Sequence, residues 1–213
     1  MPPPPAPAAT ARVLVLCGPS GAGKSRLAER LHRRYGWPVM QLDDFYLPAG
    51  DPGLPMSPWG VPDWDDAASW DLAAAVEALG TLCRTGVARI PVYDIARSAV
   101  TGHHTLRLDG SDTVVAEGIF AAHTIGPLRE RGMLLAGWCI RNRPWLTFGR
   151  RLARDLAERR KPPLTLWRRG HTLRRTEPAI VQGQLALGAE PMTAQQAEQR
   201  CRSLVGPARE GTR

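Results

Sequence analysis

The stretch RVLVLCGPSGAGKS, residues 12–25, decides the fold of this chain of 213 residues. Its first six residues are mostly valine and leucine, a composition typical of a strand that is buried on both faces. Residues 18–25 match the pattern GxxxxGK[ST] in full, and Leu27 and Leu31 follow at a helical spacing. A strand, a glycine-rich loop and a helix in this order predict a loop that binds phosphate groups.

The residue types of this loop each have a chemical reason. Glycines let successive backbone N–H groups point at phosphate oxygens, the lysine bridges the β- and γ-phosphates, and the hydroxyl binds Mg²⁺. Lys24 is one of only two lysines among 28 basic residues, and an arginine fork would be too bulky here. We therefore expect ATP and Mg²⁺ as cofactors, bound by Gly18, Ser20, Gly21, Ala22, Gly23, Lys24, Ser25 and Arg26.

Outside the loop, short apolar runs alternate with amphipathic segments. Ser69 is the expected cap of one helix, and Thr193 with Gln196 forms a capping box before the last helix. Residues 51–66, rich in proline and glycine, are expected to form a long loop. The alternation predicts an α/β protein of the P-loop NTPase fold, a parallel sheet with helices on both faces. Strands are expected at 38–42, 89–93, 113–116 and 133–140, and helices at 69–84, 144–160 and 193–205.

The length and composition define the domain organisation. Residues 1–11 form a Pro/Ala tail that we expect to be disordered, and residues 12–213 suit a single P-loop domain. The sequence shows no bilayer-spanning run and no signal-peptide pattern at its start. The four cysteines are scattered without metal-ligand spacing, so neither a zinc site nor a disulfide framework is expected, and a cytoplasmic location fits best.

The net charge of +8 comes from one block. Residues 141–175 hold twelve Arg or Lys residues against only Asp155 and Glu158. Such a block indicates a locally held anion, either polyphosphate or nucleic acid. Residues 144–163 are predicted to be a lid, a basic helix that is stopped by Pro162-Pro163 and that closes over phosphates.

Two carboxylates follow predicted strands. Glu117 comes directly after strand 113–116, where a P-loop enzyme places the acid that holds Mg²⁺ or its waters. Asp43 ends strand 38–42, so it lies at the carboxyl edge of a parallel sheet, where ligands bind. There it is either a general base for an acceptor hydroxyl or a second magnesium contact. The structural alternatives are a surface glutamate at 117 and a turn that is capped by Asp43 or Asp44.

This chain resembles uridine kinase and its relatives among the P-loop kinases, a group that includes phosphoribulokinase. The resemblance rests on six stretches, which occur here in the same order as in that family. Together they extend over about residues 12–162, and the resemblance implies transfer of the γ-phosphate of MgATP to a hydroxyl group. The stretches are GPSGAGKS (18–25), DDFY (43–46), DWDDAASWD (63–71), PVYD (91–94), VVAEGIF (114–120) and RRLARDLAERR (150–160).

The resemblance also implies roles for single residues. Lys24 and Ser25 would bind triphosphate and Mg²⁺, and Glu117 would contribute to the metal site. Asp43 would be the base that activates the acceptor hydroxyl, and Asp65 would bind acceptor hydroxyls. The remaining implied site residues are Tyr93 and Arg151 on the acceptor side, Arg154 in catalysis and Arg159 at the nucleotide.

One departure from the family concerns the base of the acceptor. In uridine kinases a histidine a few residues beyond the PxYD motif helps to read the pyrimidine, but here the next histidine is His103. We therefore expect a nucleoside-like or other polyol acceptor, but not uridine or cytidine at high efficiency. The alternative is a non-kinase P-loop ATPase or nucleic-acid-binding module that uses residues 141–175. The acidic stretch 63–71 disfavours nucleic acid, so the expected partners are a small-molecule acceptor and ATP. No membrane partner is expected, and the sequence leaves the oligomeric state open.

Overall fold

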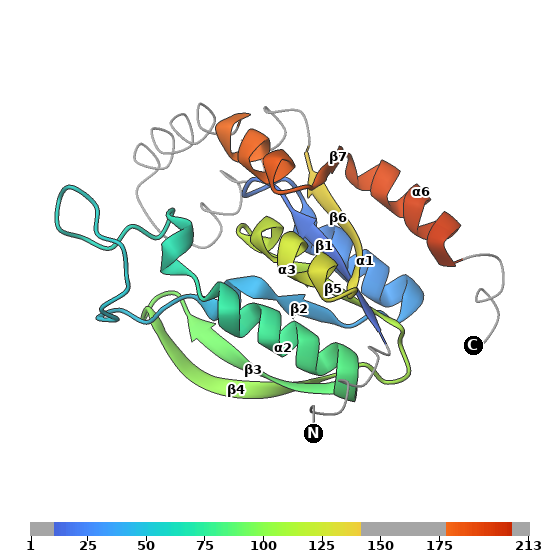
Figure 1. The fold of residues 1–213 in the computed structure, drawn as a ribbon, viewed down its shortest axis with the longest axis horizontal. Coiled ribbons are helices and arrows are strands. Elements are labelled where there is room, and N and C mark those ends of the chain that lie inside the picture. Colours follow the sequence, from blue (N-terminus) through green and yellow to red (C-terminus); the bar gives the residue numbers. More distant parts are fainter. Residues whose placement is uncertain (1–10, 142–177, 206–213) are drawn as a thin grey trace, which may run out of the picture.

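A computed structural model gives the structure of residues 11–141 and 178–205. At its centre, five parallel strands lie in the spatial order β2, β5, β1, β6, β7 (Figure 1). Because β1 is the middle strand, the glycine-rich loop that follows it lies at the middle of the carboxyl edge. The predicted parallel sheet is confirmed. Its strands are β1 Arg12–Cys17, β2 Val39–Gln41, β5 Thr113–Glu117, β6 Leu134–Ile140 and β7 Glu190–Met192.

Helices cover both faces of this sheet, as predicted. Along β1 the side chains alternate: Leu14 and Leu16 pack in the same buried cluster as Leu27 of α1. Val13 and Val15 point to the other face and share a cluster with Leu79 of α2. Burying each such side chain contributes about 1.5–3 kcal/mol, so β1 joins two apolar layers. The first face carries α1 Lys24–Tyr35 and α6 Ala194–Val205, and the second carries α2 Leu72–Thr85 and α3 Ile125–Glu130.

A two-stranded hairpin lies outside the parallel sheet. It pairs β3 Val87–Asp94 with β4 Ala99–Arg107 in antiparallel register. The strand expected at residues 89–93 is therefore real, but it does not belong to the parallel series. The sequence analysis missed β4 because this strand has no buried residue and therefore lacks an apolar pattern.

The helix expected at residues 69–84 begins later, at Leu72. Its cap is Asp71, whose side chain accepts a hydrogen bond from the backbone N–H of Ala74, so the predicted cap Ser69 is wrong. Ser69 instead ends a short 3₁₀ turn and is fully buried. Serine and aspartate side chains can both accept hydrogen bonds from the free N–H groups of the first helical turn. Both residue types therefore fit the sequence pattern of a helix start.

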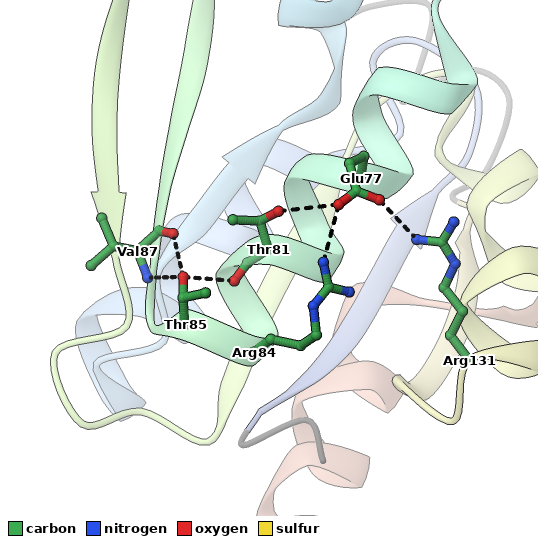
Figure 2. A network of polar contacts seen from close by, with 6 residues as sticks. All are labelled: Glu77, Thr81, Arg84, Thr85, Val87 and Arg131. Carbon is green, nitrogen blue, oxygen red and sulfur yellow. Dashed lines mark hydrogen bonds and ion pairs between the residues drawn. The ribbon is translucent and has the colours of Figure 1, made fainter. Parts of the chain in front are cut away.

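Polar contacts fix the C-terminal half of α2 to its neighbours (Figure 2). Glu77 pairs with Arg84 of its own helix at 3.0 Å and with Arg131, after α3, at 3.5 Å. The Thr85 hydroxyl donates to the carbonyl oxygen of Thr81 at 2.9 Å and accepts from the N–H of Val87 at 3.3 Å. The Thr85 contacts lie at the junction between the end of α2 and the start of β3.

The capping box before α6 is confirmed. The Thr193 hydroxyl accepts from the N–H of Gln196 at 3.2 Å, and the Gln196 side chain accepts from the N–H of Thr193 at 2.8 Å. The four cysteines form no disulfide with one another, and all are buried. In the part of the chain that the structure describes, no helix has the length and apolar character needed to span a membrane.

Residues 1–10 of the predicted tail lie outside the described residues, but Ala11 is described, is 2% exposed and packs in the same cluster as Val13, so the predicted tail is wrong at this residue. The predicted lid of residues 144–163, with its helix at 144–160, also lies outside the described residues. The single-domain organisation of residues 12–213 stays a prediction. A further helix, residues 178–186, precedes β7.

Candidate active site

The glycine-rich loop between β1 and α1 needs glycine at specific backbone positions. Gly18, Gly21 and Gly23 have φ angles of 137°, 82° and 97°, which L side chains rarely adopt. At Gly18 a Cβ would also lie 2.3 Å from the carbonyl oxygen of Ile140 on β6. The loop therefore packs directly against the neighbouring strand. Ala22 is buried within it, whereas Ser25 and Arg26 are exposed at the start of α1.

Lys24 is the first residue of α1, and only 8% of it is exposed. Its Nζ donates hydrogen bonds to the carbonyl oxygens of Gly18 at 2.9 Å and Pro19 at 3.3 Å. Burial lowers the pKa of Lys24, while the negative charges of Glu117 and Asp43 act in the opposite direction. The fold thus brings the predicted lysine and the two predicted carboxylates into one electrostatic cluster.

Glu117 is the last residue of β5 and is 7% exposed, so it is not a surface glutamate. Burial raises its pKa, and the Lys24 charge together with a hydrogen bond from Ser25 lowers it. The Ser25 hydroxyl and the Glu117 carboxylate fit Mg²⁺, which prefers oxygen ligands and takes most of the rest from phosphate and water. Within residues 11–141 and 178–205, no group of three or more His, Cys, Asp or Glu side chains could hold a metal by itself.

Asp43 lies in a 3₁₀ turn, Leu42–Phe45, directly after β2. Because Gln41 of β2 pairs with Glu117 of β5, both carboxylates lie at the same edge of the sheet. The Oδ1 atom of Asp43 accepts a hydrogen bond from the backbone N–H of Ile119 at 3.1 Å. Gly118 makes this approach possible, since a Cβ there would lie 2.8 Å from the same Oδ1. The sequence analysis missed this supporting role of Gly118 and Ile119, although both belong to the VVAEGIF stretch.

Aromatic side chains form a wall beside Asp43. The Tyr46 ring has its centroid 5.8 Å from that of Tyr93, 5.9 Å from that of Phe120 and 6.0 Å from that of Trp64. We call these four residues the aromatic wall. Sequence reasoning singled out only Tyr93. The other three belong to the quoted DDFY, DWDD and VVAEGIF stretches, so the signal was present but was not assigned to the site.

Asp65 also interacts with Tyr46 of the aromatic wall. Burial raises the pKa of the Tyr46 phenol, and the negative charges of Asp43 and Asp65 raise it further. Both carboxylates are exposed, so both can contact a small molecule next to the aromatic wall. Of the residues predicted for the acceptor side, Asp65 and Tyr93 both interact with Tyr46, as Asp43 does. Arg151, Arg154 and Arg159 lie outside the described residues.

Asp44 connects this site to the hairpin. Its Oδ1 accepts a hydrogen bond from the N–H of Tyr93 at 3.1 Å, and the Tyr93 phenol donates to the carbonyl oxygen of Leu47 at 3.2 Å. Partial burial raises the pKa of Asp44, and the charge of nearby His104 lowers it. His103 instead lies next to Arg89 across the hairpin, with 3.3 Å between Nδ1 and Nη2. Asp44 is therefore a structural link between the 3₁₀ turn and β3.

Comparison with known proteins gives a fold and not a sequence family. No protein-family model and no curated protein matches the sequence. A protein described as a fructose transport system kinase, from Silicibacter sp. TM1040, has a similar structure with a TM-score of 0.58 and 16% identity. The similarity covers 86% of this chain and 88% of that one. It confirms the predicted α/β fold of the P-loop NTPase type.

Two further solved structures are similar to this chain at lower TM-scores. A protein described as a uridine kinase, from Bacillus stearothermophilus, has a TM-score of 0.47 at 20% identity and covers 81% of this chain and 85% of its own. A D-glycerate 3-kinase from Cryptococcus neoformans has a TM-score of 0.35 at 20% identity. At these identities the likeness concerns the fold alone.

Proposed function

We propose that this protein is an ATP-dependent small-molecule kinase, which transfers the γ-phosphate of MgATP to a hydroxyl group of an acceptor. One observation carries the proposal. The charge of Asp43 acts on the buried pair of Lys24 and Glu117 and also on Tyr46 of the aromatic wall, on which Asp65 acts as well. A base at that place can face a phosphate and a hydroxyl at the same time.

The roles of the residues follow from this placement. Lys24 and the backbone N–H groups of residues 18–25 bind the β- and γ-phosphates, and Ser25 and Glu117 hold Mg²⁺, which neutralises charge on those phosphates. The acceptor oxygen forms a bond to the γ-phosphorus while the bond to the β,γ-bridging oxygen breaks, and ADP leaves. Asp43 takes the proton of the acceptor hydroxyl. Arg151, Arg154 and Arg159 are proposed to complete the site from the basic segment, where they add positive charge around the transferred group.

The acceptor is proposed to carry hydroxyls and one apolar or planar part. Asp65 would accept hydrogen bonds from hydroxyls, and the aromatic wall would pack against the planar part. Uridine and cytidine are expected to be poor acceptors, because the turn after Tyr93 provides no histidine for the pyrimidine edge. His103 pairs with Pro91 and His104 pairs with Ile90, so both lie on strand β4 and neither is in the turn of residues 95–98.

A screen for ADP release, with phosphorylated product identified by mass spectrometry, tests the proposal. Candidate acceptors are pyrimidine nucleosides, nicotinamide riboside, pantothenate, sugar phosphates and fructose, each with Mg²⁺ and with EDTA in its place. We expect product with at least one hydroxyl compound and none with EDTA. ATP hydrolysis that needs no acceptor, is stimulated by nucleic acid and weakens steeply with salt would instead establish the P-loop ATPase alternative.

A further inference from the structure

One buried amide side chain outside the quoted motifs reaches the active site from the far end of the chain. Gln184 lies on the helix of residues 178–186 and is only 6% exposed. Its Nε2 donates to the carbonyl oxygen of Ile119 at 3.0 Å, and its Oε1 accepts from the Sγ of Cys139 at 3.3 Å. Burying an amide is unfavourable unless both ends are hydrogen-bonded, and here both ends are.

The Gln184 contact matters because of what Ile119 does on its other side. The N–H of Ile119 donates to the Oδ1 of Asp43, so Ile119 is held at its carbonyl oxygen by Gln184 and holds Asp43 through its N–H. Ile119 follows Gly118, which has no side chain to fix the backbone. The N–H of Gly118 reaches the carbonyl oxygen of Leu16 only at 3.4 Å. The N–H and the carbonyl of Ile119 belong to adjacent peptide planes, so the Gln184 bond restrains the direction of the N–H through the two backbone torsions of Ile119.

We infer that Gln184 is a positioning residue for the reaction: it fixes the Ile119 backbone, and through it the carboxylate of Asp43. This inference rests on the proposed function of Asp43 as the base. Phe120 of the aromatic wall is the next residue, so the same bond also stabilises one side of the acceptor site. A base that is displaced by about 1 Å can cost on the order of 10²-fold in rate, so a single bond to its support has a measurable effect.

The first test replaces Gln184 by methionine, which has a similar length and no hydrogen bond to offer. For Gln184→Met we expect kcat to fall about tenfold while the Kd for ATP changes less than twofold. Leu185→Met, on the same helix and packed against the same core, is the matched control and should keep kcat. An unchanged kcat in Gln184→Met would overturn the inference.

The second test separates positioning from a general loss of packing. Cys139→Ala removes the other bond of the Gln184 amide and leaves the Ile119 bond in place, so its kcat should stay within about twofold. In an Asp43→Asn background, Gln184→Met should cause no further loss of kcat, because its effect passes through Asp43. A full additional tenfold loss in that background would show a merely structural role.

A third measurement does not depend on activity. Hydrogen exchange of the Ile119 amide, followed by NMR, should be at least tenfold faster in Gln184→Met than in the native protein, while the Val15 amide in the central strand stays unchanged. If no acceptor is ever phosphorylated, the proposed function fails, and this exchange rate still decides whether Gln184 holds Ile119. Equal exchange at Ile119 in both proteins would overturn the inference even in an active kinase.

Discussion

The two halves of the candidate site are built in different ways. The phosphate half comes from eight consecutive residues, 18–25, whose shape depends on their own glycines. The acceptor half combines the 3₁₀ turn after β2, the long loop, the hairpin and the turn after β5, which lie far apart in the sequence. A contiguous motif can be identified from its residue types alone, whereas an assembled site depends on contacts that only the fold creates. The two halves should therefore respond differently to substitution.

The largest effect is expected in the phosphate half. Lys24→Ala should lower kcat by about 10³-fold or more, because the transferred phosphate loses the positive charge that stabilises it. A coupled enzymatic assay of ADP release measures this fall in kcat. Arg33→Ala is the control, since Arg33 is an exposed residue paired with Glu29 near the other end of α1. Near-normal turnover in Lys24→Ala would contradict the kinase proposal.

Asp43 lies where the two halves of the site meet, and its substitution should slow the chemical step without weakening ATP binding. Asp43→Asn keeps an oxygen for the Ile119 N–H but cannot take a proton, so kcat should fall on the order of 10²-fold. ATP affinity, measured by titration calorimetry, should stay within about threefold. Collapsed ATP binding would instead make Asp43 a magnesium or structural residue.

The backbone beside Asp43 allows a sharper test of its position. Gly118→Ala would place a Cβ 2.8 Å from the Asp43 Oδ1 and 3.1 Å from the Leu42 Cβ, so the carboxylate must move. We expect a fall in kcat of about tenfold with ATP affinity retained. Gly126→Ala is the matched control, because a Cβ there meets no atom within 4 Å. A fully active Gly118→Ala would show that Asp43 tolerates displacement.

In the acceptor half the expected effect is on KM. Trp64→Ala removes a ring of the aromatic wall and should raise the KM for the acceptor about tenfold with little change in ATP binding. Trp59 lies in the same long loop but is 86% exposed, so Trp59→Ala should leave both constants unchanged. Steady-state kinetics with varied acceptor distinguish the two variants. Equal effects of the two substitutions would show that Trp64 does not contribute to the acceptor site.

The smallest effect is expected outside both halves. Thr193→Ala removes the side chain that accepts from the Gln196 N–H at the start of α6, and should lower the free energy of unfolding by about 1 kcal/mol. Denaturant titration measures this loss. The kcat should be unchanged, and a changed kcat would mean that α6 influences the active site.

The phosphate half and the parallel sheet could be predicted because their signals are local. The glycine-rich loop, the strands beside it and the Thr193 box each depend on neighbours within a few residues. Asp43 and Glu117 could also be placed, since each follows an apolar strand and the carboxyl ends of parallel strands meet at one edge. A local pattern does not distinguish Ser69 from the true cap Asp71, because both residue types suit a helix start.

The acceptor half could be predicted only in part, because its members meet through tertiary contacts. Tyr46 and Phe120 are separated by more than seventy positions, yet their rings lie 5.9 Å apart. The exposed strand β4 gave no apolar pattern to detect. Gln184 is a polar residue on an ordinary helix, and only the fold shows that it is buried beside Ile119. Burial and distant partners, which decide these roles, are not encoded in local residue types.

The burial of the four cysteines has a consequence for measuring local opening of the protein. Burial raises the pKa of Cys83, on α2, to about 11 and that of Cys201, on α6, to about 12, so both thiols are protonated at neutral pH. Alkylating reagents react with exposed thiolates, so modification requires that the surrounding segment first opens. Because α2 and α6 lie on opposite faces of the sheet, the two alkylation rates report separately on the opening of each helical layer. The native chain therefore supports this measurement without any introduced residue.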